Sequence, residues 1–215
     1  MYVPPHFALD DLEEIAALVS AVATADLVTV DSDGSPESSL LPVTWDRAPS
    51  PAGPYGRLIA HAAVLNQQWT RVVDGARALA VVRGPQAYIS PSWYAAKAEH
   101  GRVVPTWNYS AVHFSGTIEL VRDAESLRGI VTALTDLHEG RRPDPWAVSE
   151  APSAYIDGQL NAIIGIVVHI DRIEAKAKLS QNRSAADQDG VVAGLRADPL
   201  RDSAAIADAM DGRAR

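Results

Sequence analysis

The central part of the chain alternates apolar and polar residues through short segments with no long helix between them. This period of two is typical of β-strands. It predicts strands at residues 27–30, 38–45, 57–61, 77–83, 86–90, 103–121, 165–170 and 173–179. Asp33-Gly34 and Gly84-Pro85 are turn signals, and the proline-rich residues 47–56 form a loop. The chain is therefore restricted to folds built on a mostly antiparallel sheet.

Helical periodicity surrounds this region. Apolar residues recur every three or four positions in 9–23 and 124–138, and Asp10 with Glu13 is a helix-start signature for the first. Shorter helices are expected at 66–73, 153–163, 184–195 and 204–210. Six or seven strands with peripheral helices predict an α+β fold, a closed or split β-barrel. We expect one domain over residues 1–195 and a C-terminal tail over 196–215 with a short helix.

Composition excludes several classes of protein. The 215 residues include no Cys, which excludes disulfides, thiolate metal sites and a cysteine nucleophile. The first residues lack the features of a signal peptide, and no apolar run reaches about 18 residues. We therefore expect a cytoplasmic protein without membrane association. The net charge of −8 opposes DNA binding by the whole surface, because DNA contact depends on clustered Lys and Arg.

Aromatic and ionisable side chains are concentrated between residues 88 and 109. They are Tyr88, Trp93, Tyr94, Lys97, Glu99, His100, Trp107 and Tyr109. This mixture suits a site that holds a flat ring by a few charged groups. It suits a dimer interface or a loop packed on the barrel mouth equally well. No phosphate-binding loop, nucleophile elbow or dinucleotide fingerprint is present to point to a common enzyme class.

Two further features have both a structural and a functional interpretation. His61 ends an apolar strand, where a lone His is either hydrogen-bonded into the core or a neutral ligand for heme iron. The segment 178–183, Lys-Leu-Ser-Gln-Asn-Arg, collects hydrogen-bond donors that suit a phosphate or carboxylate group. The same segment is also what a strand end followed by a helix cap would contain.

Several ordered motifs together resemble one family. They lie at residues 1–4, 87–94, 97–101, 103–109 and 178–183. They are similar to the PaiB-type FMN-binding split-barrel proteins, often named negative transcriptional regulators. The resemblance implies a homodimeric split β-barrel related to the pyridoxamine-phosphate-oxidase fold, with cofactor sites at the subunit interface.

The chain departs from this family at three positions. Leu40 stands where the family usually has His, Val64 where it usually has Arg or Lys, and Ala177 where it has an aromatic residue. An Arg or Lys at position 64 would suit the FMN phosphate. The changes resemble a branch of the family, the piperazate synthases, which use heme b to close N5-hydroxyornithine into piperazic acid by forming an N–N bond.

This resemblance implies roles for individual residues. His61 would be the axial metal ligand, and Leu40, Val64 and Leu65 would contact the porphyrin. The cofactor site would also use Trp93, Tyr94, Lys97, His100, Arg102, Trp107 and Arg183, with the cationic groups near the propionates. Glu99, His100 and Tyr109 would be the candidate catalytic bases.

Three functions are thus compared. The first is a heme-dependent piperazate synthase-like enzyme acting on a small amino-acid substrate, and the second is an FMN-binding regulator or flavin-binding protein. The third, a DNA-binding repressor without cofactor chemistry, is disfavoured because the chain is acidic and neither long helix has a basic recognition face.

Overall fold

Strands and helices occupy most of residues 1–200 and 202–213, which the structure, a computed structural model, describes. The strands are β1 (Thr24–Val30), β2 (Pro36–Pro42), β3 (Thr44–Asp46), β4 (Arg57–Ala63), β5 (Arg77–Ile89), β6 (Thr106–Val121) and β7 (Ile163–Lys178). The α-helices are α1 (Leu12–Val22), α2 (Gln67–Arg71), α3 (Ala96–His100), α4 (Ala124–Glu139), α5 (Ser153–Leu160), α6 (Ala185–Ala197) and α7 (Ser203–Arg213). Short 3-10 helices lie at Pro5–Phe7, Pro91–Trp93 and Val148–Glu150. None of the described helices is long and apolar enough to cross a membrane.

The strands form one seven-stranded sheet in the order β2-β1-β5-β6-β7-β4-β3. β2 lies at one edge, yet it contacts β4 near the other edge, so the sheet curls back on itself. This arrangement confirms the predicted α+β split barrel.

Contacts within the chain define two compact units, which we describe separately. The first unit comprises Met1–Ile15, Arg83–Val112 and Glu174–Arg215, and the second comprises Ala16–Val82 and His113–Ile173. The long strands β5, β6 and β7 contribute residues to both.

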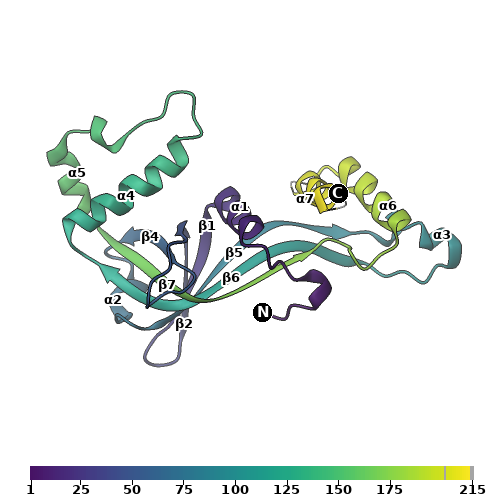
Figure 1. The fold of residues 1–215 in the computed structure, drawn as a ribbon, viewed down its shortest axis with the longest axis horizontal. Helices are drawn as coiled ribbons and strands as arrows, with labels where there is room; N and C mark the ends of the chain where they lie inside the picture. Colours follow the sequence, from purple (N-terminus) through teal and green to yellow (C-terminus); the bar gives the residue numbers. More distant parts are fainter. Residues whose placement is uncertain (201, 214–215) are drawn as a thin grey trace. The chain divides into compact units, whose positions relative to one another are not determined.

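In the second unit, α4 covers one face of the sheet. Its apolar residues Leu127, Ile130 and Leu134 form a buried cluster with residues of α5 and β7. The helix begins where the Asp123 carboxylate accepts a hydrogen bond of 2.8 Å from the Ser126 amide, a normal N-cap. The amphipathic helix predicted at 124–138 is therefore present (Figure 1).

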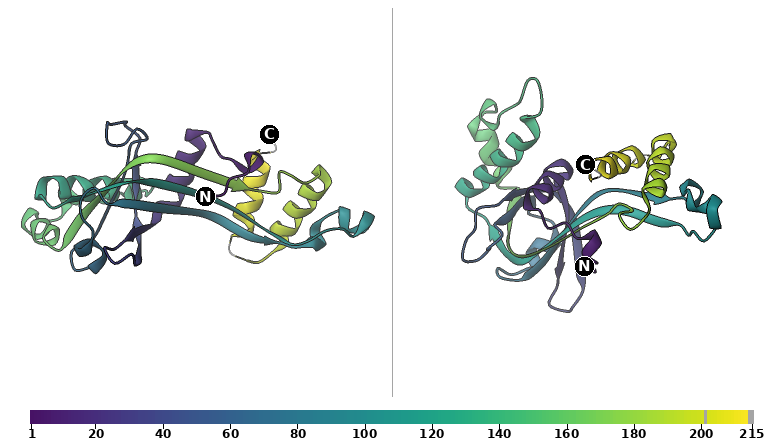
Figure 2. Two further views of the ribbon diagram at one scale, coloured as in Figure 1. Left: turned by 90° about the horizontal axis from the view of Figure 1, so that it is seen from below. Right: turned by 45° about the vertical axis from the view of Figure 1, so that its right-hand side comes forward.

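In the first unit, α6 and α7 lie side by side and share one apolar core with the adjoining strand ends (Figures 1 and 2). Ser184 caps α6, as the sequence predicts, by accepting a hydrogen bond from the Asp187 amide. α7 falls in the segment expected to be a tail, and Ile206 packs in the core. Residues 201, 214 and 215 of that predicted tail lie outside the described residues.

One turn prediction is wrong. Gly84-Pro85 was expected to reverse the chain, but β5 runs through both residues without interruption. The pairing of β5 with β1 ends at Val81, so the later part of β5 has no β1 partner on that side. Proline is tolerated in a strand where no ladder hydrogen bond is required from its nitrogen.

Two boundaries also differ from expectation. The first helix starts at Leu12, because the carboxylate of Asp11, and not that of Asp10, accepts the amide of Glu13 at 2.7 Å. The segments predicted as separate strands at 165–170 and 173–179 form the single strand β7. The exposed Asp171 between them forms an ion pair with Arg77, so its polarity does not end the strand.

Candidate functional site

His61 lies on β4 between Ala60 and Ala62, which point into the core of the second unit. Its imidazole is half-buried, and its Nδ1 atom is enclosed without a hydrogen-bond partner among the described residues. Burial lowers the pKa of His61 below its ordinary value, because desolvation penalises the charged imidazolium. The residue therefore carries a neutral imidazole at neutral pH, which is the form that binds iron.

Directly across the sheet, His61 is paired with Gly165 of β7. Directly opposed residues share a face of the sheet, so the ring lies beside a backbone position without a side chain. A Cβ atom at Gly165 would stand 2.6 Å from Cδ1 of Ile130 on α4. Glycine is thus required for α4 to pack closely over this part of β7.

Exposed aliphatic side chains lie on the segments that flank His61. Leu40 on β2 is 64% exposed, and Val64 and Leu65 after β4 are 38% and 87% exposed. Apolar residues exposed in one neighbourhood often mark a binding surface. The second unit therefore combines a neutral imidazole with uncovered aliphatic groups.

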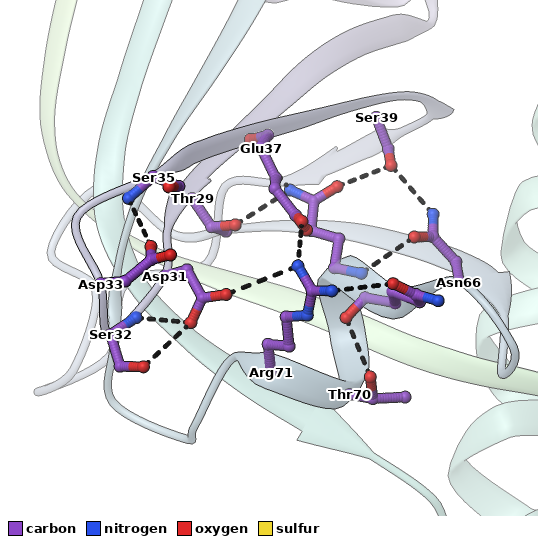
Figure 3. Close-up of polar contacts among 12 residues, drawn as sticks. Thr29, Asp31, Ser32, Asp33, Ser35, Glu37, Ser39, Asn66, Thr70 and Arg71 are labelled. Carbon is purple, nitrogen blue, oxygen red and sulfur yellow. Dashed lines mark hydrogen bonds and ion pairs between the residues drawn. The ribbon is translucent and has the colours of Figure 1, made fainter.

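A polar network joins these segments (Figure 3). Asn66 donates a hydrogen bond of 3.0 Å from Nδ2 to Oγ of Ser39. Ser39 precedes Leu40 and Asn66 follows Leu65, so this bond closes a seam between β2 and the β4–α2 connection. Leu40 alternates with Ser39 along β2, so its side chain points to the other face of the strand. The residues that the resemblance singles out at positions 40 and 64 thus lie on connected segments.

Gln68 anchors the same network, which includes Thr29 and Ser39 of Figure 3. Its side chain, in a residue only 3% exposed, donates to the carbonyl of Leu27 and the hydroxyl of Thr29, both at 3.0 Å, and accepts from Ser39 at 2.6 Å. At the surface, Arg71 is paired with Glu37 at 2.7 Å. The sequence carries no local signal for Gln68, because its partners come from distant strands.

Lowering the pH from about 7.5 to about 5.5 is expected to destabilise the protein more than its His61→Gln variant. The pKa of His61 is lower in the folded than in the unfolded chain, so the unfolded chain binds more protons below about pH 6.5. Stability is thus lost as the pH falls through that range. Urea unfolding of the wild type and the variant at both pH values measures how much unfolding free energy each loses. Equal losses in the two proteins would contradict the burial of His61.

In the first unit, the candidate bases lie on and after α3. Glu99 and His100 are exposed, and Lys97 donates a hydrogen bond of 3.0 Å to the hydroxyl of Ser92. His100 Nδ1 accepts the backbone amide of Arg102 at 3.1 Å. His100 Nε2 and the Arg102 guanidinium thus belong to an open surface that a ligand can approach.

Tyr94 and Trp93 have a different environment. Tyr94 is 3% exposed, and the guanidinium of Arg183 stands 4.6 Å from the centre of its ring. Burial raises the pKa of Tyr94. Trp93 packs on α6, where a Cβ at Gly194 would lie 2.3 Å from the indole. Tyr94 therefore belongs to the core of this unit, with the cation of Arg183 beside it, and the partly buried Trp93 packs against that core.

Trp107 and Tyr109 alternate with the buried Asn108 along β6. Trp107 is exposed, and its ring centre lies 6.3 Å from that of Tyr88 in a T-shaped arrangement. The ammonium of Lys176 lies over the ring of Tyr109, 5.2 Å from the ring centre. This strand face is thus aromatic and cationic.

Two lysines lie on β7: Lys176 was missed as a site residue, whereas Lys178 begins the segment 178–183 that the sequence indicates as a possible anion site. Lys176 is buried and donates a hydrogen bond to the carbonyl of Tyr2, and Lys178 donates to the hydroxyl of Thr106. Burial lowers the pKa of Lys178. The alternation Lys176, Ala177, Lys178 is a period-two signal that indicates one cationic strand face.

The predicted site residues thus fall into two sets. The second unit holds His61, Leu40 and Val64, which lie on connected segments. The first unit holds Trp93, Tyr94, Lys97, Glu99, His100, Arg102, Trp107, Tyr109 and Arg183. The described residues contain no group of three or more His, Asp or Glu side chains placed to hold a metal ion.

Comparisons with known proteins agree with this fold. The sequence model of a family described as "Putative FMN-binding domain" matches residues 1–172. The chain is 28% identical over 213 residues to the protease synthase and sporulation protein PAI 2 of Bacillus subtilis, covering 99% of this chain and 98% of that protein.

Two solved structures share the architecture at low sequence identity. A conserved hypothetical protein of Mycobacterium tuberculosis is 16% identical, with a TM-score of 0.58 over 85% of this chain and 92% of that one. An FAD and heme binding protein of Mycobacterium smegmatis is 17% identical, with a TM-score of 0.55 over 86% of this chain and 79% of that one. These two similarities establish the fold alone.

Proposed function

Because the chain belongs to the family of putative FMN-binding domains, we propose that it is a heme-binding member of that family with piperazate synthase-like activity. The proposed protein is a cytoplasmic homodimer that acts on a small amino acid and not on DNA. The proposal concerns heme b, with His61 as the axial ligand.

The observation that carries the proposal is the neutral, half-buried imidazole of His61, whose Nδ1 has no hydrogen-bond partner among the described residues. Heme iron accepts one neutral imidazole nitrogen, and a porphyrin needs apolar contacts around it. The exposed Leu40 and Val64 would supply such contacts, and neither can donate a hydrogen bond to a flavin phosphate from its side chain. The residues present in the second unit therefore fit heme.

Bound heme would supply a Lewis acid that weakens the N–O bond of a hydroxylamine. In N5-hydroxyornithine, the α-amine nitrogen would form a bond to N5 while the N–O bond breaks and the hydroxyl leaves as water. A general base would take the proton from the attacking amine, a role that the family resemblance implies for Glu99, His100 or Tyr109. This closure is redox-neutral and requires no second substrate.

Charged residues of the first unit are candidates to bind carboxylate groups, as the family resemblance implies for propionates. They are Lys97, Arg102 and Arg183, and the exposed indole of Trp107 offers a flat apolar face. Trp93 and Tyr94 would hold the loop and Arg183 in place.

The heme-loaded protein is expected to convert N5-hydroxyornithine to piperazic acid, because the iron and a positioned base are both needed for N–N bond formation. Consumption of substrate and formation of product are measured by mass spectrometry. The apoprotein, expected to be inactive, is the control. Unchanged substrate with fully heme-loaded protein would remove the cyclase assignment.

FMN binding is the second candidate, and the description of the matched family favours it. The cationic and aromatic strand face with Tyr109, Lys176 and Lys178 suits a flavin phosphate. In that case the protein would be a PaiB-like regulator or another flavin-binding protein. A yellow protein with flavin absorption and no Soret band distinguishes this candidate from the heme proposal.

A further inference from the structure

A groove of about 530 Å³ separates α4 from the sheet in the second unit. Its floor includes Ile59 and Val167, which are paired across β4 and β7, together with Val121 of β6. Ile130 adds an apolar wall from α4. The interior of the groove therefore favours an apolar group.

The groove stays open because α4 presents small residues toward it. Ser126, Gly129 and Ala133 line this side. A Cβ atom added at Gly129 would meet nothing within 4 Å. The space is thus present without any movement of the helix.

A row of ionisable side chains crosses four neighbouring strands along one side of the groove. Asp46 on β3 pairs with Arg57 on β4, and Arg57 lies opposite His169 on β7. His169 Nε2 contacts Glu119 of β6 at 2.7 Å. Of these residues, Asp46, Arg57 and Glu119 line the groove.

Arg57 and Glu119 both have hydrogen-bonding capacity left for a ligand. Asp46 accepts the Nε–H of Arg57 at 3.0 Å, and no other described residue contacts its guanidinium in a hydrogen bond or ion pair. Glu119 uses its Oε2 for His169 and is 55% exposed. The groove thus offers a cationic donor and an anionic acceptor beside one apolar floor.

Both groups can reach one small ligand. β7 lies between β4 and β6, so the backbones carrying Arg57 and Glu119 are about 10 Å apart. Both side chains line the same groove, and both are long and partly exposed. An α-amino acid carries its carboxylate and ammonium on one carbon atom, so it is short enough to contact both groups while its side chain enters the groove.

We propose that this groove binds a free α-amino acid with an apolar side chain. Its carboxylate accepts from Arg57, its ammonium donates to Glu119, and its side chain packs on the floor formed by Ile59 and Val167. The inference does not rest on heme or flavin binding.

The test is calorimetric titration of the purified protein with leucine and phenylalanine. Both are expected to bind with dissociation constants below about 1 mM, whereas leucinamide and N-acetyl-leucine, which each lack one charge, bind at least about tenfold more weakly. Ornithine, with a cationic side chain, is expected to bind at least about tenfold more weakly than leucine because the apolar floor would desolvate its second ammonium. Equal binding of leucine and N-acetyl-leucine would overturn the proposal, as would no binding of leucine.

Variants locate the binding within the protein. Gly129→Leu fills the groove and is expected to abolish leucine binding, while Gly158→Leu on α5, also at an open position outside the groove, leaves it unchanged. Circular dichroism confirms that both variants are folded. Arg57→Gln is expected to weaken leucine binding at least about tenfold and leave leucinamide binding unchanged.

A further variant separates this site from the proposed heme site. His61→Ala should lose the heme spectrum and keep leucine binding, whereas Gly129→Leu should keep the heme spectrum. Leucine binding that survives Gly129→Leu would place the amino acid elsewhere and refute the groove.

Discussion

His61→Ala is expected to lower the affinity of the protein for heme at least about 100-fold, because axial ligation is lost. The imidazole is neutral and half-buried beside Gly165, so no other side chain at this point of β4 replaces it. Heme is titrated into both proteins and the Soret absorbance is followed. Added imidazole is expected to restore the spectrum of the variant, since the free ligand fits the space left by the side chain.

His138→Ala is the matched control, because His138 is an exposed residue in the last turn of α4. It should bind heme as the wild type does. An unchanged Soret band in His61→Ala would show that iron is bound elsewhere, and flavin absorption in place of a Soret band would favour the FMN candidate.

Gln68→Ala is expected to lower the free energy of unfolding by about 3 kcal/mol. The substitution removes the donor to the Leu27 carbonyl and the Thr29 hydroxyl, and it leaves both buried groups without that partner. It also removes the acceptor of the Ser39 hydroxyl, so Asn66 alone then holds Ser39 and the seam loosens. Urea unfolding measures the stability, and heme titration measures the effect on the seam.

Gln67→Ala provides the control one residue away. Gln67 is exposed, and its side-chain oxygen accepts a surface hydrogen bond from Arg71, so loss of the side chain should change stability by less than about 0.5 kcal/mol. If the two variants are equally stable, the network of Figure 3 does not hold the seam together.

The strands and long helices could be predicted because their signals are local. The helix at 124–138 has a continuous apolar stripe and a capping aspartate, and both act within one segment. The turn at Gly84-Pro85 failed because its outcome depends on whether β1 still pairs with β5 at that point. The predicted helix cap at Asp10 was wrong by one residue, and Asp11 caps the helix instead. Either carboxylate can accept an amide at the start of a helix, so the sequence did not distinguish them.

Part of the candidate site could also be predicted from the sequence, again where the signal is local. His61 could be singled out as a lone imidazole in an apolar strand, but its enclosed Nδ1 depends on the packing around β4. Lys176 and Lys178 carried a period-two signal, whereas their burial did not show in the sequence.

Residue type and the periodicity of side chains along single segments predicted a barrel built on a mostly antiparallel sheet and excluded thiol chemistry. The family resemblance then implied the split barrel and the role of His61 as a heme ligand. The contact of Ser39 with Asn66 and the row formed by Asp46, Arg57, His169 and Glu119 are evident only in the folded structure. These contacts join residues far apart in the chain, and their register is set by strand pairing and by the curl of the sheet, which no local pattern encodes.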